Sequence, residues 1–410
     1  MKKILLILTL MLTCWQAASA YDFMVNGIAY DKNSDGNTVK VTCTNHVWNT
    51  LDYENYSGSQ TITQANIPET VSNGGKTYTV TSIGEQAFSG CSTFTTFEIP
   101  TSVASIGASA FQGCTGLISM EIPAKVTTLL SGTFSNCTNL TSVTFAEGSL
   151  LESIGSTFAN SGLVSIEIPA KVSTIASGTF HDCKKLESVT FAEGSQLTTF
   201  ASEAFNICIN LTTIDIPESV TTINNSAFSG CSGLTSLIIP KNVERIGDYA
   251  FLGCGFKYLV FLAENPPSLD NEIFDEIPED IVIYVPNDNY KNWGGFTNFK
   301  GVYDYKTVAL NEIDAAMNGA TLTDAEKGAI SNYKDQINSA SDLAAVIAAK
   351  EAALAIIKLH PTKAAALAEI QAEMDGIPID VSSAYNVFPA SCWNKHCHLL
   401  RTKHLPESRI

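Results

Sequence analysis

The sequence predicts a β-solenoid followed by a small all-α domain, and three observations carry this prediction. The first is a pattern, L-x-x-I-x-I-P-x-x-V-x-x-I-x-x-x-A-F-x-x-C, that recurs about every 23 residues from Thr81 to Cys254. The second is a strand-rich polar segment before the pattern, and the third is an Ala-rich helical segment after it. One such unit cannot bury its apolar residues alone, so successive units must stack and cover one another.

Residues 1–20 are predicted to be a secretory signal peptide. Lys2 and Lys3 are followed by an apolar stretch at 4–12, and Ala18-Ser19-Ala20 is a small-residue cleavage site. Cys14 leaves a lipoprotein as the alternative, although Thr13 is larger than the residue that usually precedes a lipidated cysteine. No later segment has a membrane-spanning length. We therefore expect an exported protein that is secreted, held at the cell surface or associated with the outer membrane.

Residues 21–79 are expected to form a β-rich N-terminal cap, which a solenoid needs because its first coil would otherwise expose core and a strand edge. Within this cap, Asp31-Lys-Asn33-Ser-Asp35-Gly36 imitates the start of an EF-hand calcium loop. The twelfth position is Thr42 instead of the bidentate glutamate, and strands flank the motif. A β-turn between strands explains it better, with calcium as the alternative.

Residues 80–264 are expected to be the repeat array, in which each coil is a strand, a corner, a short second strand and a bend. Every repeat has a phenylalanine followed three residues later by cysteine, with Ser161 as the exception; the phenylalanines are Phe88, Phe111, Phe134, Phe158, Phe180, Phe205, Phe228 and Phe251. Two coils carry an Ala-Glu-Gly-Ser insertion, at 146–149 and 192–195, which indicates a duplicated two-coil block. Residues 265–305, with Tyr290, Trp293, Phe296 and Phe299, are expected to be the C-terminal cap.

The repeat cysteines allow two interpretations. Export favours a disulfide framework, whereas one cysteine at the same position of each coil is typical of a ladder of buried free thiols. Ser161 interrupts the ladder without any compensating change. The sequence therefore favours thiols that act as small packing residues.

Residues 306–378 are expected to form a small bundle of three or four helices. Thr323 and Glu326 form a capping box, and a helix from 343 is expected to end at His360-Pro361 before another begins at Thr362. Residues 379–410 fit neither neighbour in composition. We expect a disordered tail there, because Cys392 and Cys397 with the nearby histidines have no recognised metal-site spacing.

Composition excludes several classes of function. The formal net charge of −17 argues against nucleic acid as a partner, because phosphate binding needs clustered Lys and Arg. No catalytic triad, phosphate loop or metal motif appears, so we expect no enzyme activity, no cofactor and no metal.

The array resembles the BspA-type leucine-rich repeats of bacterial surface proteins, over about residues 67–305. The resemblance rests on the repeated Ile-Pro, Ile-Gly-x-x-Ala-Phe and Cys positions. It implies a right-handed curved leucine-rich-repeat solenoid with a parallel sheet on its concave face. It also implies surface adhesion, or binding to host proteins, other bacteria or glycans. The chain departs from the family pattern at Ser161, at the two insertions and in the tail.

The outward side of the first strand in each coil is the candidate ligand-binding surface. Because side chains alternate along a strand, Leu140, Val143 and Phe145 should point inward, and Ser142 and Thr144 outward. The equivalent residues form a hydroxyl column beside an intermittently acidic one: Thr96, Glu98, Ser119, Glu121, Ser142, Thr144, Ser165, Glu167, Ser188, Thr190, Thr213, Asp215 and Ser236. A solvated strand face is the alternative interpretation.

The function expected from these features is binding or adhesion along the solenoid face, with a protein or a glycan as the partner. The alternative is a structural scaffold that presents the helical domain. Glu98 and Glu121 are rejected as a catalytic acid pair, since hydrolysis requires one raised pKa and a cleft.

Overall fold

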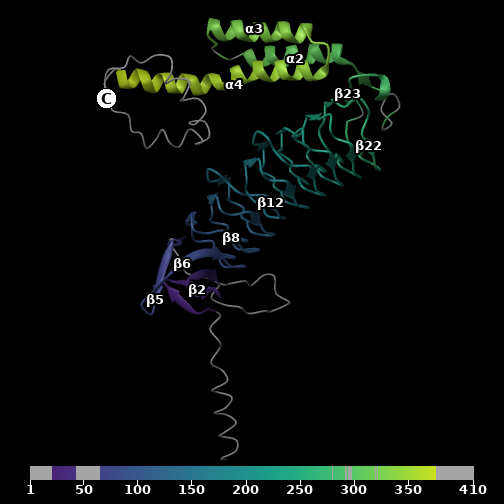
Figure 1. The fold of residues 1–410 in the computed structure, drawn as a ribbon. Coiled ribbons are helices and arrows are strands. Elements are labelled where there is room, and N and C mark those ends of the chain that lie inside the picture. The colour runs from purple at the N-terminus through teal and green to yellow at the C-terminus, as the bar shows by residue number, and fades with distance from the viewer. Residues whose placement is uncertain are drawn as a thin grey trace, which may run out of the picture. The chain divides into compact units, whose positions relative to one another are not determined.

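The computed structural model describes residues 21–42, 65–278, 280–290, 293, 298–318, 320 and 322–374, with the side chains of the last helix described to residue 358. The predicted signal peptide, Cys14, Phe296 and the tail from residue 379 lie outside these residues. The chain divides into two compact units, Met1–Tyr305 and Lys306–Ile410. The first is a stack of β coils and the second is helical (Figure 1).

The coils of the first unit carry strands on two sides. Sheet A is formed by the V-x-x-I step of each coil and joins the N-terminal strands to the array in the order β1-β2-β3-β6-β8-β10-β12-β14-β16-β18-β20-β22, with β5 paired to β6. Its strands are β1 (Phe23–Val25), β2 (Ile28–Lys32), β3 (Thr38–Thr42), β5 (Thr70–Asn73), β6 (Lys76–Ile83), β8 (Ser105–Ile106), β10 (Thr128–Leu129), β12 (Ser153–Ile154), β14 (Thr174–Ile175), β16 (Thr199–Phe200), β18 (Thr222–Ile223), β20 (Arg245–Ile246) and β22 (Ser268–Leu269).

The other side of the coils carries two sheets in succession. Sheet B runs in the order β17-β15-β13-β11-β9-β7-β4 and sheet C in the order β19-β21-β23-β24. The strands of sheet B are β4 (Ala65–Asn66), β7 (Thr96–Glu98), β9 (Ser119–Ile122), β11 (Ser142–Phe145), β13 (Ser165–Ile168), β15 (Ser188–Phe191) and β17 (Thr213–Ile214). Those of sheet C are β19 (Ser236–Ile239), β21 (Tyr258–Phe261), β23 (Val282–Tyr284) and β24 (Phe299–Lys300).

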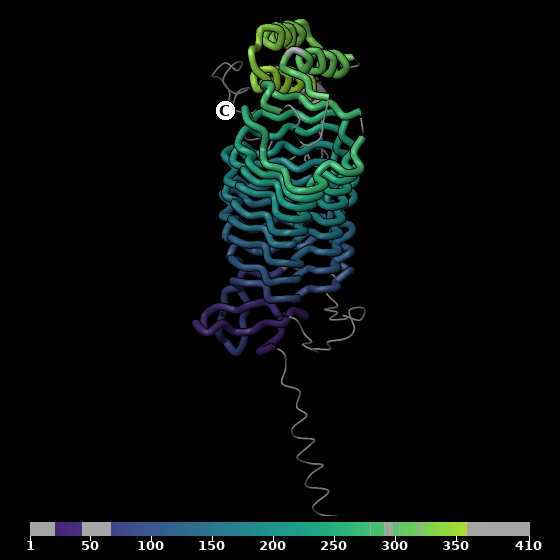
Figure 2. Tube along the Cα trace, turned by 90° about the vertical axis from the view of Figure 1, so that its right-hand side faces the viewer, coloured from purple at the N-terminus to yellow at the C-terminus, as the bar shows by residue number. Residues whose placement is uncertain are grey.

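All neighbours in the array pair in parallel, as stacked coils require. Figure 2 shows the coils following one another with nearly the same path. The predicted order of strand, corner, short strand and bend, and with it the solenoid of stacked parallel coils, is confirmed.

A stack of phenylalanine rings forms the centre of the array. The rings from Phe88 to Phe251 are fully buried, and each is nearly parallel to the next, with centroids 5.1–5.9 Å apart. An aromatic ring buries a large apolar area, and its contacts here reach the coils on both sides. The stack is therefore a continuous apolar link between successive coils.

The cysteine ladder lies beside this stack, and its seven thiols are free and buried. Each thiol from Cys114 onward donates to the carbonyl of the phenylalanine one coil earlier, with Sγ···O distances of 3.0–3.2 Å. Each of these carbonyls also accepts a hydrogen bond from the backbone N–H three residues further along its own coil. The Phe88 carbonyl, for example, accepts from the N–H of Cys91. The interpretation as packing thiols is confirmed, and hydrogen bonding explains why cysteine suits the position. Ser161 is 5 % exposed and its Oγ lies 3.5 Å from Cys183 Sγ.

These thiols predict a loss of stability at alkaline pH. Burial raises the pKa of Cys183 to about 11, and it raises the pKa values of Cys208, Cys231 and Cys254 as well. A raised folded-state pKa stabilises the fold fully below the unfolded-state value, and this contribution disappears as the pH rises through the folded-state value. Denaturation at increasing pH should show unfolding becoming easier from about pH 9 to pH 11. Cys183→Ala should make this decline shallower, and an equal slope in both proteins would contradict the account.

Ile207 has a strained backbone. Its φ is 60°, in the left-handed region. The same position is occupied by Asp182 in the preceding coil and by Gly230 in the following coil. A β-branched residue is unfavourable there, whereas asparagine tolerates it, as Asn160 and Asn136 do two and three coils earlier. The side chain is 38 % exposed, so its burial does not offset the strain.

Ile207→Asn is therefore expected to raise the free energy of unfolding by about 1 kcal/mol. The comparison variant is Ile209→Asn, which changes a similarly exposed isoleucine outside the left-handed region and should have almost no effect. Chemical denaturation of the two variants measures the difference. No gain from Ile207→Asn would show that the coil accommodates this φ without strain.

The N-terminal strands confirm the turn interpretation of the EF-hand-like motif. β2 and β3 form an antiparallel hairpin across it. The Asp35 carboxylate accepts hydrogen bonds from the backbone N–H groups of Asn37 and Thr38 and from the Thr38 hydroxyl, which lowers its pKa. Asp31 pairs with Lys40 across the hairpin at 3.5 Å. Donors within the turn thus contact the Asp35 carboxylate, and Lys40 contacts the Asp31 carboxylate.

Aromatic side chains cover the last coils of the first unit. Trp293 packs edge-on against Phe261, with the two ring centroids 4.8 Å apart. Its indole N–H donates to the Pro267 carbonyl, with an N···O distance of 2.9 Å. Tyr290, in the short helix η1 (Asp288–Tyr290), is fully buried and donates to the Ala263 carbonyl. These polar anchors fix the rings that close the core at this end.

The second unit holds helices α2 (Val302–Met317), α3 (Asp324–Ser339) and α4 (Leu343–Met374), with the first residues of α2 counted in the first unit. The capping box of Thr323 and Glu326 is present at the start of α3. The predicted helix end at His360-Pro361 is wrong, because α4 continues to Met374. An interior proline removes one backbone hydrogen bond, and the surrounding alanines are strong helix formers that keep the helix intact.

Candidate functional site

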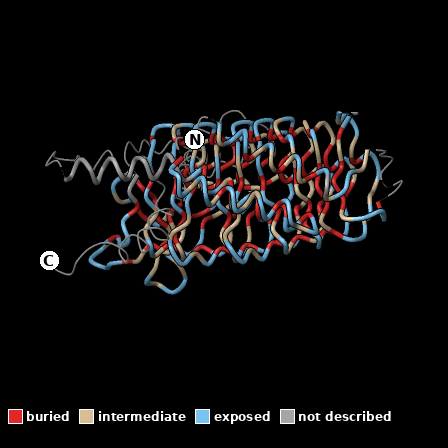
Figure 3. The backbone as a smooth tube through the Cα atoms, turned by 90° about the horizontal axis from the view of Figure 1, so that it is seen from above, coloured by how far each residue is buried: buried red, intermediate tan, exposed pale blue. Residues whose placement is uncertain are grey.

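The candidate surface is the outward side of sheet B. The hydroxyl residues lie in one register across the strands, since Thr96 pairs with Ser119, Ser119 with Ser142, Ser142 with Ser165, Ser165 with Ser188, and Ser188 with Thr213. Between these outward residues, Phe97, Met120, Val143, Ile166, Val189 and Ile214 are buried. Figure 3 shows buried and exposed residues following one another along the coils. The period of two in the sequence thus identified both sides of these strands correctly.

The second column contains Glu98, Glu121, Thr144, Glu167, Thr190 and Asp215, all of them exposed. Glu121 aligns with Thr144, and Glu167 aligns with Thr190. Among the described residues, none forms an ion pair or a side-chain hydrogen bond with the four carboxylates. The twelve residues from Thr96 to Asp215 in these two columns are called the sheet B face below.

One predicted residue, Ser236, lies beyond the end of sheet B. Ser236 starts β19, which pairs with β21 in sheet C and not with β17. The strand at Thr213 is only two residues long, and the ladder of sheet B ends there. Ser236 is also half-buried. The paired strands of sheet B therefore end at the coil of Asp215, and Ser236 lies on the next coil, in sheet C.

A second hydroxyl row, on sheet A, was not selected from the sequence. It contains Ser105, Thr128, Ser153, Thr174, Thr199 and Thr222. In the sequence, this row could have been found as the hydroxyl residue that precedes the last residue of each V-x-x-I step. That last residue is isoleucine except at Leu129 and Phe200. Of these six residues, only Ser105 and Thr174 are exposed. Of the seven predicted hydroxyl residues on the opposite side of the coils, five are exposed. Sheet A is thus the less open of the two surfaces.

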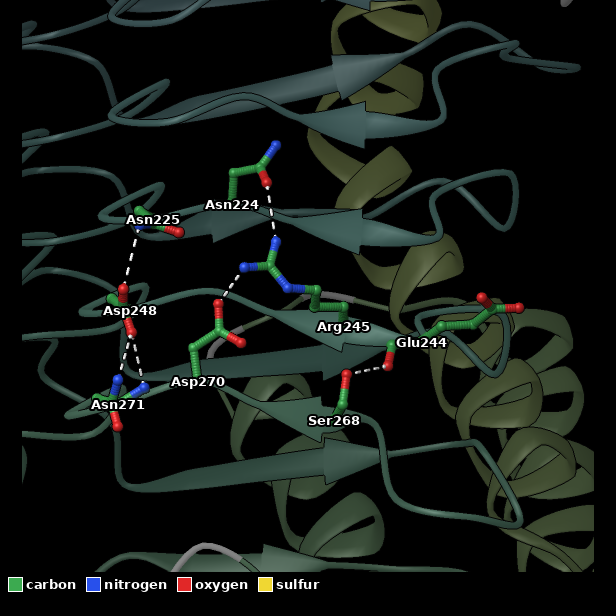
Figure 4. A network of polar contacts seen from close by, with 8 residues as sticks. All are labelled: Asn224, Asn225, Glu244, Arg245, Asp248, Ser268, Asp270 and Asn271. Carbon is green, nitrogen blue, oxygen red and sulfur yellow. Dashed lines mark hydrogen bonds and ion pairs between the residues drawn. The ribbon is translucent and has the colours of Figure 1, made fainter.

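Polar contacts bind the coils to one another beside sheet A (Figure 4). Arg245 forms an ion pair with Asp270 and donates to the Asn224 side chain at 3.4 Å. Asp248 accepts a bond from Asn225 on one side and from the Asn271 backbone N–H, at 2.7 Å, on the other. The charged groups of Arg245, Asp248 and Asp270 thus form contacts between successive coils. The carboxylates of the sheet B face have no such partners in the described part of the chain.

The chemistry of the site is that of a binding surface. The face presents hydroxyls that donate and accept hydrogen bonds, and carboxylates that accept them. In the described part of the chain, no three His, Cys, Asp or Glu side chains gather in a way that could hold a metal ion. No helix among the described residues is long and apolar enough to cross a membrane.

Stacked parallel coils with a repeat near 23 residues and a polar outward strand face define a leucine-rich-repeat protein. Within that class, the model for the BspA-type leucine-rich repeat region matches residues 51–157 and 155–278 with six copies. This covers more than half of the 410 residues, and the chain belongs to this family. Members of the family are often surface antigens or adhesins and are generally not enzymes.

Solved structures of bacterial leucine-rich-repeat proteins are similar to this chain. A leucine-rich repeat protein from Bacteroides ovatus is 25% identical, with 68% of this chain and 76% of that chain covered and a TM-score of 0.48. The T. pallidum leucine-rich repeat protein is 24% identical, with coverage of 57% and 90% and a TM-score of 0.40. The pneumococcal vaccine antigen PcpA is 21% identical, with coverage of 68% and 96% and a TM-score of 0.31. None of the curated proteins matches.

Proposed function

We propose that the protein is an exported binding or adhesion protein, held at the cell surface or secreted, which recognises a protein or glycan partner along the sheet B face. The observation that carries the proposal is a largely exposed face of aligned hydroxyls and of carboxylates that form no ion pair or side-chain hydrogen bond with other described residues. Such a face forms many weak, directional hydrogen bonds with a ligand that extends over several coils. The signal-like residues 1–20 and the family's frequent role as surface antigens support export.

The test is a screen of the mature chain against extracellular matrix proteins and a glycan array. Replacing Glu98, Glu121, Glu167 and Asp215 with serine should weaken binding to each target about tenfold or more, because every exposed charge contact contributes up to about 1 kcal/mol. The four substituted side chains are solvent-exposed, so the fold should persist. Unchanged affinity in a folded variant would refute the proposal.

A scaffold that presents the helical unit is the second candidate, since residues 306–410 form a compact unit of their own. Asn332→Lys with Asp335→Lys alters the exposed side of α3 and separates the two functions. Under the proposed function these changes leave binding intact. Loss of binding on changing α3, with none on changing the sheet B face, would favour the scaffold.

A further inference from the structure

The twelve residues of the sheet B face carry a net negative charge. Its twelve positions contain four carboxylates and no lysine or arginine. Lys184 and Lys185, which come shortly before β15, are engaged elsewhere: Lys184 with Asp182 at 2.9 Å and Lys185 with the Thr138 carbonyl at 3.2 Å. The complementary partner surface is therefore cationic, and this excludes a neutral or anionic glycan as the best fit.

Three of the four carboxylates also have a regular spacing, whereas Glu98 lies on the coil next to that of Glu121. Glu121, Glu167 and Asp215 stand on alternate coils, with Thr144 and Thr190 on the coils between them. Adjacent strands are about 4.8 Å apart, so successive carboxylates of this row are about 10 Å apart. A matching partner must repeat its cations at that distance along one side.

One regular backbone conformation does this while leaving its carbonyls free to accept hydrogen bonds, which an α-helix with cations at every seventh position does not. A polyproline II helix rises about 3.1 Å per residue with three residues per turn, so every third side chain points to the same side about 9 Å further along. An ordinary β-strand would place residues i and i+3 on opposite sides. The polyproline II backbone has no internal hydrogen bonds, which leaves its carbonyls free to accept from the hydroxyl column of the face.

We propose that the sheet B face binds an extended protein segment in the polyproline II conformation that carries Lys or Arg at every third position. The segment crosses the strands of sheet B, with its cations over Glu121, Glu167 and Asp215. This inference rests on the proposed function, because it names the partner of the same surface.

The experiment measures the affinity of the full chain for two synthetic peptides at physiological ionic strength. One peptide consists of repeated Lys-Pro-Pro units, and the other has the same composition with all lysines gathered at one end. The periodic peptide should bind about tenfold more tightly, since only its cations reach all three carboxylates at once. Equal affinity for both peptides would overturn the spacing argument.

A charge-matched pair of variants locates the binding. Glu121→Gln with Glu167→Gln and Asp215→Asn should weaken binding of the periodic peptide about tenfold. Glu85→Gln with Glu203→Gln and Glu244→Gln removes the same charge outside the face and should leave the affinity within about twofold. Equal weakening in both variants would reduce the interaction to general electrostatic attraction and refute the inference.

The result also separates this inference from the proposed function. If the periodic peptide does not bind, but a screened protein or glycan still binds through the sheet B face, the partner chemistry is wrong and the proposed function stands. If changing the face affects no target at all, both fail.

Discussion

Phe180→Ala is expected to lower the free energy of unfolding of the array by about 3–5 kcal/mol. The Phe180 ring is fully buried and lies parallel to those of Phe158 and Phe205, at 5.5 and 5.1 Å. Its removal leaves a cavity with one wall in each neighbouring coil, and stacked coils are stabilised mainly by such nearest-neighbour contacts. Chemical denaturation of the full chain, followed by its β-sheet signal, measures the loss.

Ile118→Ala is the matched control for this substitution. Ile118 belongs to the same array but is 47 % exposed, so its truncation should cost less than about 0.5 kcal/mol. A similar small cost for Phe180→Ala would mean that the ring stack does not hold the coils together.

Glu312→Gln should destabilise the helical unit by about 2 kcal/mol. Its carboxylate lies 3.0 Å from the ammonium group of Lys350, a residue that is only 7 % exposed on α4. Removing the negative charge takes one counter-ion away from a buried cation. This costs several kcal/mol in a fully buried pair and less here, because Glu312 is partly exposed. The array contains almost no helix, so the helical signal in circular dichroism reports this unit selectively.

The companion substitution Lys350→Met distinguishes charge from packing. It removes the buried cation and keeps an apolar chain of similar length, so stability should stay level or rise. If Lys350→Met destabilised the unit as much as Glu312→Gln does, the ion pair would be a net source of stability and the interpretation of a costly buried charge would be wrong.

The sequence was sufficient to predict the coils and their outward residues. A fixed repeat and a period of two determine which side chains face the core, and both are properties of neighbouring residues along the chain. Ser142 and Thr144 are exposed and Val143 is buried for this reason. The cysteines were assigned to packing from the one exception at Ser161, although their bonds to phenylalanine carbonyls depend on coil-to-coil geometry that the sequence does not show.

Other features depend on tertiary context. The end of sheet B at Thr213 places Ser236 in another sheet, yet the sequence pattern continues through both positions unchanged. Pro361 was interpreted as a helix end because local propensity favours one, whereas α4 accommodates it. The left-handed φ of Ile207 follows from the path of its coil and overrides the preference of its side chain.

Photo-crosslinking from opposite sides of one coil tests the sheet B face most directly. Ser142, the first residue of β11, and Ser153, the first residue of β12, are each replaced by a photoreactive phenylalanine analogue in the full chain. With a protein target identified in the screen, or with the Lys-Pro-Pro peptide, the account predicts a crosslink from position 142 and none from position 153. A crosslink from position 153 alone would contradict it and assign binding to sheet A.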